Sequence, residues 1–345
     1  MVYQITDLHR LLRKRRRGWV KQKTVVVPGG AGFLGSHLCA RKLAQGHRVI
    51  CVDNLQTGRL ANIAGMIGTE GFSFFKHDVT EPLRIEGAVD EIFNLACAAS
   101  PPKYQIDPVH TFRTNIWGAM NLLDLAREKD ARILQASTSE VYGDPEIEQQ
   151  DETYCGRVNT VGPRACYDES KRAAETLFHD YHQRHGVETR IIRIFNTYGP
   201  HMDPGDGRVV SNFIVQAIRG QDLTLYGDGS QTRSFCYVDD LLDGMEALMA
   251  LPCDFPGPVN IGNPAECSVR DLAQLVLELT GTGSGLVEKA LPQDDPRRRR
   301  PDITLAQRTL GWAPQVALRE GLQHTIEYFI AELERGSAGV RVKTT

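Results

Sequence analysis

Short apolar segments alternate with longer amphipathic ones along the first half of the chain. The segment KTVVV ends at Pro28 and Gly29, and the next stretch has helical spacing and ends at Gly46. Strands that are apolar along their whole length are typical of a parallel sheet with helices on both faces. The pattern predicts strands at 23–27, 47–53, 72–78, 91–96, 131–137 and 189–195, and helices at 33–45, 109–129 and 167–185.

The alternation changes near residue 197, where several prolines and glycines indicate loops. Beyond them, shorter strands and helices predict a second unit. Right-handed crossovers then give a Rossmann-type, doubly wound parallel α/β sheet with a smaller C-terminal α/β lobe, and ligands should bind between the two. The predicted division is a basic extension at 1–22, a Rossmann domain at 23–196, a smaller lobe at 197–335 and a tail at 336–345. The chain can cross between the Rossmann domain and the smaller lobe.

Composition and charge argue against several classes of protein. The chain has 345 residues, of which 41% are hydrophobic and 24% charged, and its net charge of −3 does not indicate a nucleic-acid binder. The Lys/Arg-rich segment 1–23 is expected to be a solvated extension, with contact to a membrane surface or nucleic acid as the alternative. No apolar stretch reaches the roughly 18 residues of a membrane span. The eight cysteines form no CxxC pair, which argues against a metal site and favours a reducing, cytoplasmic location.

A glycine-rich loop follows the first predicted strand with the spacing GxxGxxG. Glycines at these positions allow a tight turn and let backbone amides approach a pyrophosphate at the start of a helix. Glycine loops also occur by chance, so the assignment depends on the strand and helix around this one. The residues predicted to contact a dinucleotide here are Gly29, Gly32, Phe33, Leu34 and Gly35.

Carboxylates end the second and third predicted strands. Asp53, eighteen residues after Gly35, is placed to accept hydrogen bonds from both ribose hydroxyls and to repel a 2′-phosphate, so the cofactor is expected to be NAD. Its neighbour Asn54 is assigned to the same site, and Asp78 could meet the adenine amino group. A loop-capping role is the alternative for Asp53, and a turn or cap role is the alternative for Asp78.

A tyrosine and a lysine have the spacing YxxxK on a predicted helix. This spacing places the phenol of Tyr167 and the ammonium of Lys171 on one helix face, where the ammonium should lower the pKa of the phenol toward neutrality. Tyr167 would then act as an acid and base. Thr138 and Ser139 follow the fifth strand, and a hydroxyl there can bond a substrate hydroxyl. The alternatives are a surface helix and an ordinary Ser/Thr turn.

Seven motifs together resemble the UDP-glucuronate decarboxylases, a group within the extended short-chain dehydrogenases. The likeness runs from about residue 24 to about residue 330, and SPPKYQ, STSEVYGDP and QDDPRRRRPDI separate this group from other enzymes of nucleotide sugars. The motifs are GGAGFLGS, STSEVYGDP, RACYDESKR, RIFNTYGP, DGRVVSNF, YGDGSQTRSF and QDDPRRRRPDI.

The resemblance implies a reaction without net oxidation. Tightly bound NAD would accept hydride from C4 of UDP-glucuronate, the resulting β-keto acid would lose CO2, and C4 would be reduced again to give UDP-xylose. Tyr167 would move the C4 proton, Lys171 would support it, and Thr138 would bond the C4 oxygen. Glu140 and Arg299 would share the handling of the carboxylate and the C5 proton.

Other positions follow from the same resemblance. Ser139 stands where the related 4,6-dehydratases have an acid that protonates a leaving hydroxyl, so it favours decarboxylation and is assigned to the substrate site with Arg299. Each of the remaining assignments has a capping or core polar role as its alternative. They are Asn196 and Arg208 for the UDP portion, Arg233 for the diphosphate, Tyr104 for the sugar acid and Asn115 for the nicotinamide end.

Two other kinds of function are weighed against this one. The first is another NAD-dependent nucleotide-sugar enzyme, either a 4-epimerase or a 4,6-dehydratase. The second is a regulator that binds NAD without catalysis, which would be expected to have lost Thr138, Tyr167 or Lys171; all three are present. The resemblance also implies a homodimer, joined by a four-helix bundle of the helices near 109–129 and 167–185.

Overall fold

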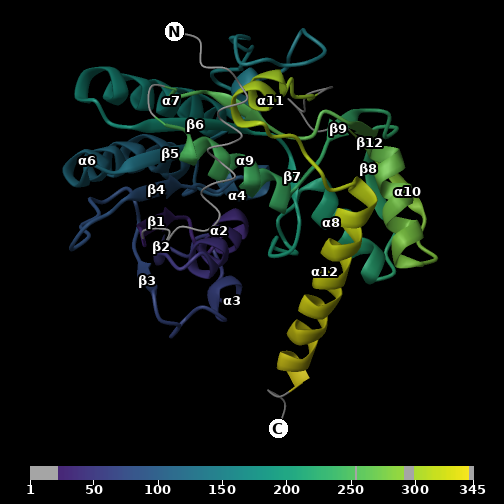
Figure 1. Cartoon of the computed structure of the whole chain (residues 1–345). Coiled ribbons are helices and arrows are strands. Elements are labelled where there is room, and N and C mark those ends of the chain that lie inside the picture. Colours follow the sequence, from purple (N-terminus) through teal and green to yellow (C-terminus); the bar gives the residue numbers. More distant parts are fainter. Residues whose placement is uncertain (1–21, 253–254, 291–298, 342–345) are drawn as a thin grey trace.

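A seven-stranded parallel sheet forms the centre of the molecule (Figure 1). The structure, a computed structural model, describes residues 22–252, 255–290 and 299–341. The strand order is β11-β6-β5-β4-β1-β2-β3, so the predicted doubly wound Rossmann-type sheet is confirmed. The strands are β1 (Thr24–Pro28), β2 (Arg48–Asp53), β3 (Phe72–Lys76), β4 (Glu91–Asn94), β5 (Arg132–Thr138), β6 (Thr189–Ile194) and β11 (Val259–Ile261).

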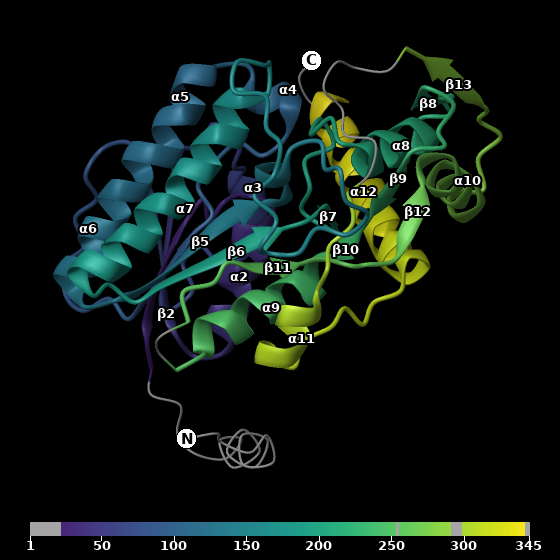
Figure 2. The ribbon, with the colours of Figure 1, turned by 90° about the horizontal axis from the view of Figure 1, so that it is seen from above.

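Both faces of the sheet are covered by helices, as Figure 2 shows. In β1 the side chains of Val25 and Val27 pack into one hydrophobic cluster and Val26 into another, because successive side chains of a strand point to opposite faces. The first cluster includes side chains of α2 (Phe33–Ala44) and α9 (Val238–Ala250). The second includes those of α6 (Ala119–Lys129) and α7 (Ala165–His185). The short α5 (Pro108–Arg113) lies on the same side as α6 and α7.

The C-terminal lobe consists of longer helices and two-stranded ribbons. In Figure 1 the helix α12 (Leu318–Arg341) runs down the right side of the molecule, beside α8 (Val209–Ile218) and α10 (Val269–Thr280). The ribbons pair β7 (Thr197–Tyr198) with β10 (Cys236–Tyr237), β8 (Leu223–Tyr226) with β13 (Leu286–Lys289), and β9 (Thr232–Ser234) with β12 (Glu266–Ser268). Four short helices complete the described elements: α3 (Leu60–Ile63), α4 (Pro101–Tyr104), the 3-10 turn η3 (Ser139–Tyr142) and α11 (Thr304–Leu310).

Three features differ from the sequence pattern. The seventh strand β11 was not predicted, since its three residues VNI are too few to show a period. The helical stretch 109–129 contains a π-helical turn, η2 (Thr114–Gly118), at whose end an added Cβ on Gly118 would lie 2.7 Å from Val79. Helix α12 continues to Arg341, so residues 336–341 of the predicted tail are helical. Residues 1–21 of the predicted extension lie outside the described residues.

Three polar side chains attach helix α7 to the sheet. Glu175 of α7 accepts hydrogen bonds from Ser137 of β5 (2.5 Å) and from Arg193 of β6, whose Nε and Nη2 lie 3.0 and 2.7 Å from its carboxylate oxygens. The Arg193 and Glu175 side chains are only 13% and 12% exposed. The bidentate geometry fixes how far α7 lies along β5 and β6. Because Tyr167 and Lys171 are on α7 and Thr138 ends β5, this contact also positions the candidate chemistry.

Replacing Glu175→Ala should lower the free energy of unfolding by about 3–5 kcal/mol, because the Arg193 guanidinium is left buried without its anion. Urea unfolding measures the change. The matched control is Glu169→Ala on the same helix, whose side chain is 32% exposed and pairs with Arg172 only at 3.7 Å. Its change should stay within roughly 0.5 kcal/mol. Equal effects of the two substitutions would contradict the assignment.

Candidate active site

A cavity of about 670 Å³ lies at the carboxyl ends of the strands, between the sheet and the C-terminal lobe. A volume of this size is typical of ligand sites. Most of the residues singled out by sequence contribute to its wall. They are Gly29, Gly32, Phe33, Leu34, Gly35, Tyr104, Thr138, Ser139, Glu140, Tyr167, Lys171, Asn196, Arg208, Arg233 and Arg299. Four predicted cofactor residues lie outside the described lining: Asp53, Asn54, Asp78 and Asn115.

Two glycines of the loop stand where neighbouring backbone leaves no room for a side chain. Gly29 has φ +77, and a Cβ there would lie 2.6 Å from the carbonyl carbon of Leu95. A Cβ on Gly35 would lie 2.2 Å from the carbonyl oxygen of Gly29. Helix α2 begins at Phe33 with Gly32 as its N-cap, so no side chain caps its first amides. These amides at the cavity wall fit a pyrophosphate, and the loop therefore fits a dinucleotide such as NAD.

Asp53 holds this loop in place. Its Oδ2 accepts a hydrogen bond from the Ala31 amide at 3.0 Å, and its Oδ1 accepts one from the Leu55 amide at 2.8 Å. Burial raises the pKa of the Asp53 carboxyl, and the two backbone hydrogen bonds oppose that rise. The geometry matches the loop-capping alternative, while a contact with the ribose stays a prediction.

Asp78 sits in a polar network at the edge of the sheet. It accepts hydrogen bonds from Asn54 Nδ2 at 2.9 Å, from Thr80 N at 3.0 Å and from His110 Nε2 at 2.9 Å. Partial burial opposes ionisation, but these hydrogen bonds hold the pKa of the Asp78 carboxyl well below its usual range. The carboxylate is thus ionised and oriented, and its contact with adenine stays a prediction.

Tyr167 and Lys171 share one face of α7, as their spacing predicts. Both are buried, and Lys171 Nζ lies 5.7 Å from the centre of the Tyr167 ring. The ammonium donates a hydrogen bond to the carbonyl oxygen of Ala136 at 2.8 Å. Burial raises the pKa of Tyr167 well above its ordinary value, and a hydrogen bond with Thr138 lowers it less. Desolvation of the phenol is the largest influence on this pKa, and the expected lowering by Lys171 stays a prediction.

Glu140 lies between two arginines at the wall of the cavity. Arg164 Nη2 is 2.6 Å from Glu140 Oε2, and Arg299 Nη1 is paired with Oε1. Burial would raise the pKa of Glu140, but the charges of Arg299 and Arg164 lower it below its usual value. The structure thus brings the predicted Glu140 and Arg299 together. Arg164 was missed by sequence reasoning, although it stands in the motif RACYDESKR three residues before Tyr167.

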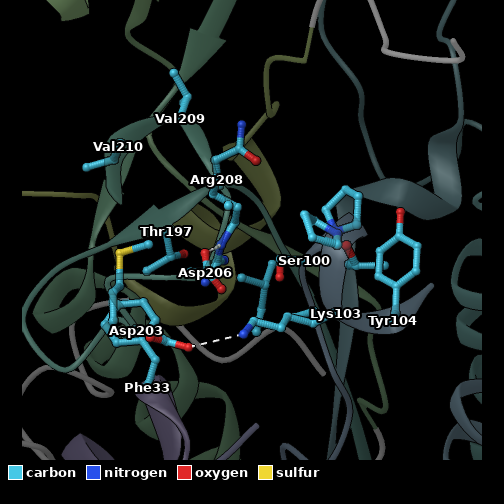
Figure 3. A pocket seen from close by; sticks show the side chains of 18 of the residues that line it. Phe33, Ser100, Lys103, Tyr104, Thr197, Asp203, Asp206, Arg208, Val209 and Val210 are labelled. Atoms are coloured by element: carbon cyan, nitrogen blue, oxygen red, sulfur yellow. Dashed lines mark hydrogen bonds and ion pairs between the residues drawn. The ribbon is translucent and has the colours of Figure 1, made fainter. Parts of the chain in front are cut away.

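Two segments from opposite lobes meet across the cavity, as Figure 3 shows. Lys103 of α4 forms an ion pair at 3.4 Å with Asp203, which lies in the loop before α8. Beside Lys103, Tyr104 is buried and stacks on Tyr167, with ring centres 4.9 Å apart. The hydroxyl of Tyr104 is buried and has no hydrogen-bond partner among the described residues. A polar group of a ligand could satisfy it.

The remaining predicted residues divide between the lobe wall and the core. Arg208 precedes α8 and is paired with Asp206, and Arg233 donates to the Thr232 carbonyl at 2.8 Å. Asn115 lies in the π-helical turn, outside the described lining of the cavity. It donates a hydrogen bond at 2.9 Å to the Oγ of Ser170, the residue that precedes Lys171 in the chain. Within the described ranges, no group of three His, Cys, Asp or Glu residues is arranged to hold a metal ion.

Comparison with known proteins agrees with this geometry. A profile of the NAD dependent epimerase/dehydratase family matches residues 25–262. The chain is 53% identical over 313 residues to UDP-glucuronic acid decarboxylase 1 of Xenopus tropicalis, a match that spans 91% of this chain and 73% of that protein. The chain belongs to the UDP-glucuronic acid decarboxylases of this family. The resemblance read from the motifs is confirmed.

A second relative and a solved structure are also similar to this member of the decarboxylase family. It is 54% identical over 299 residues to UDP-glucuronic acid decarboxylase 5 of Arabidopsis thaliana, which covers 86% of each chain. A solved UDP-glucuronic acid 4-epimerase from Bacillus cereus, in complex with UDP-glucuronic acid and NAD, superposes with a TM-score of 0.80 at 26% identity, over 90% of this chain and 99% of the other. Across the described part of the chain, no helix is both long and apolar enough to cross a membrane.

Replacing Gly35→Ala should weaken NAD binding by more than about tenfold, or roughly 1.4 kcal/mol, because the new methyl group displaces the Gly29 carbonyl. Titration of protein freed of nucleotide, followed by calorimetry, measures the dissociation constant. Gly65→Ala is the control, since a Cβ there meets nothing within 4 Å. Unchanged NAD affinity in folded Gly35→Ala protein would rule out this role for the loop.

Proposed function

We propose that this protein converts UDP-glucuronate to UDP-xylose and CO2, with NAD recycled in the site. The observation that carries the proposal is the position of two guanidiniums, the buried Arg299 and the partly buried Arg164, in the wall of the same cavity as Tyr167 and Thr138. Cations there suit a sugar that bears a carboxylate next to the carbon being oxidised. The names of the relatives agree with this substrate.

The chemistry begins at the C4 hydroxyl of the sugar. Bound NAD, held by the glycine loop, would supply the hydride acceptor at C4 and later the hydride donor. Tyr167 takes the C4 hydroxyl proton, while Thr138 hydrogen-bonds the same oxygen. Because burial keeps Tyr167 protonated, its ionisation needs positive charge close to the ring, and Lys171 Nζ at 5.7 Å from the ring centre contributes it. The same phenol returns the proton when C4 is reduced.

Decarboxylation follows from the C4 ketone. The ketone makes the C5 carboxylate part of a β-keto acid, so the bond from C5 to the carboxyl carbon breaks and its electron pair becomes an enolate. Arg299 and Arg164 orient the carboxylate before it leaves as CO2. Glu140, kept ionised between them, orients both guanidiniums. The proton that C5 gains comes from the solvent, and Glu140 would relay it to the enolate. Reduction of the C4 ketone then gives UDP-xylose.

The rival reactions are less well supported by the same residues. A 4,6-dehydratase needs an acid to protonate a leaving hydroxyl, and this cavity has the buried Ser139 at that position. A 4-epimerase of UDP-glucuronic acid would meet the same carboxylate, but the solved one shares only 26% identity with this chain, against 53% for a UDP-glucuronic acid decarboxylase. Asn196, Arg208 and Arg233 line the lobe side of the cavity, where they would hold the UDP portion.

Exposed apolar side chains on one surface support a homodimer. Val109, Phe112, Trp117 and Met120 of α5, η2 and α6 are 60%, 43%, 50% and 39% exposed. A row of large apolar groups on helices is typical of a protein interface. These helices, with α7, would form a four-helix bundle with a second copy. The seven described cysteines are free, which is compatible with the cytoplasm favoured by the sequence.

Purified protein given UDP-glucuronate without added NAD should release CO2 and form UDP-xylose, because the cofactor is expected to copurify. Mass analysis of the nucleotides shows both the product and the loss of the carboxyl group.

Tyr167→Phe should reduce kcat by about 10²–10⁴-fold. Tyr181→Phe on the same helix, with its hydroxyl bonded to Asp124 at the surface, should leave the rate unchanged. A product that keeps all its carbon would exclude decarboxylation and favour the epimerase or dehydratase.

Sedimentation should show a dimer at micromolar concentration. Trp117→Glu should weaken the dimer by about 2 kcal/mol, or roughly thirtyfold in dissociation constant, because a charge would face the apolar partner helix. Ile67→Glu, at a position 54% exposed on another surface, is the control and should not change the dissociation constant. A wild-type monomer at this concentration would disprove the four-helix interface.

A further inference from the structure

Asp168 is a buried carboxyl group beside the candidate acid and base. It follows Tyr167 in the first turn of α7 and is 6% exposed. Its Oδ1 atom is buried and receives no hydrogen bond from any described residue. An ionised carboxylate oxygen in such a place is costly, because neither water nor a donor replaces its lost solvation. The geometry therefore favours the protonated form of Asp168 whenever the surrounding charge permits it.

The charge around Asp168 is closely balanced. Arg164 and Arg299 attract its negative form, but both are already paired with Glu140. Glu140 and the neighbouring Glu169 repel it. Among the described residues, the cluster at the cavity wall thus contains two carboxyl groups, of Asp168 and Glu140, and two guanidiniums. The described charged and titratable groups that face Asp168 are Glu140, Arg164, Arg299, Glu169, Tyr104, Cys166 and Tyr167.

The substrate of the proposed function would bring a third carboxylate to these two cations. Counted over the described residues of this cluster, three anions against two cations leave one negative charge unbalanced, and a proton on one carboxyl group removes it. Of the two carboxyl groups, Glu140 binds this proton less readily, because two guanidiniums contact it directly and lower its pKa. Asp168 binds it more readily, since burial first and then the charge of Glu140 raise its pKa to about 7.

We propose that Asp168 is a positioning residue that takes up one proton when UDP-glucuronate binds, so that Arg164 and Arg299 can hold the substrate carboxylate while still bound to Glu140. The proton comes from the solvent and returns to it after the carboxylate has left as CO2. The inference rests on the proposed function, since it needs a substrate that carries a carboxylate.

The direction of the pH dependence follows from the same balance. Below about pH 7, Asp168 already holds its proton and substrate affinity is independent of pH. Above that pH each binding event must draw a proton from solution, so the affinity for UDP-glucuronate falls by up to about tenfold per pH unit. UDP-glucose, which has no carboxylate, should bind with the same affinity across this range.

Calorimetry at pH 8 in phosphate and in Tris tests the proposal, because the two buffers differ in ionisation enthalpy. The NAD-loaded Tyr167→Phe protein holds substrate without turnover. About one proton should be taken up per UDP-glucuronate bound and none per UDP-glucose. The substitution Asp168→Asn in the Tyr167→Phe protein should abolish this proton uptake. The substitution Glu169→Gln in the same protein, which removes the adjacent and more exposed carboxylate, should leave the proton uptake intact.

Equal proton uptake for the two ligands, or uptake that persists in the Asp168→Asn protein, would overturn the proposal. If Asp168→Asn does not fold, the wild-type enzyme still decides: its KM for UDP-glucuronate should rise above pH 7 while the inhibition constant of UDP-glucose stays constant. A flat KM would also overturn it. CO2 release without proton uptake refutes this inference alone, and proton uptake without CO2 release by the wild-type enzyme refutes the proposed reaction alone.

Discussion

Helix α7 can meet the sheet in only one register, because Glu175 is bonded at once to Ser137 of β5 and to Arg193 of β6. Everything at the centre of the cavity depends on that register. It sets Tyr167 and Lys171 against Thr138 at the end of β5, and it places the first turn of α7 beside Glu140 and its arginines. A shift of one helical turn, about 5.4 Å, would separate the phenol from the hydroxyl that shares its substrate atom.

The balance of burial and charge explains why the two carboxyl groups of this cluster differ. Burial opposes the ionisation of Glu140, yet two guanidiniums contact it directly and keep it ionised. The same arginines also lower the pKa of Asp168, but less than burial raises it. Likewise the loss of solvent around Tyr167 raises the pKa of its phenol more than the hydrogen bond with Thr138 lowers it. Local contact, more than residue type, decides the protonation of each group.

The sequence predicted those features that depend on near neighbours in the chain. The apolar run of β1, the glycines before α2 and the pair Tyr167 and Lys171 each have a fixed spacing, and all lie where expected. Features that depend on tertiary contacts could not be seen in this way. The ion pair of Arg164 joins residues 24 positions apart, and the bonds of Asp53 to the loop amides reflect burial that no spacing shows. The π-helical turn ends at Gly118, next to Val79, a contact that no helical period reveals.

The pairing of β11 with β6 has a consequence for how the protein forms. The segment from β7 to α9 leaves the sheet after β6 and returns to it only at Val259, so part of the smaller lobe, including α8, lies between two adjacent strands of the larger one. The helices α10 and α12 of that lobe follow β11. During synthesis the sheet cannot be completed until residue 261 has left the ribosome, by which time β7 to α9 have also emerged. The two lobes are therefore expected to mature together, because β11 and the later strands β12 and β13 each pair with a strand from far earlier in the chain. A cut near residue 197 would leave both parts incomplete.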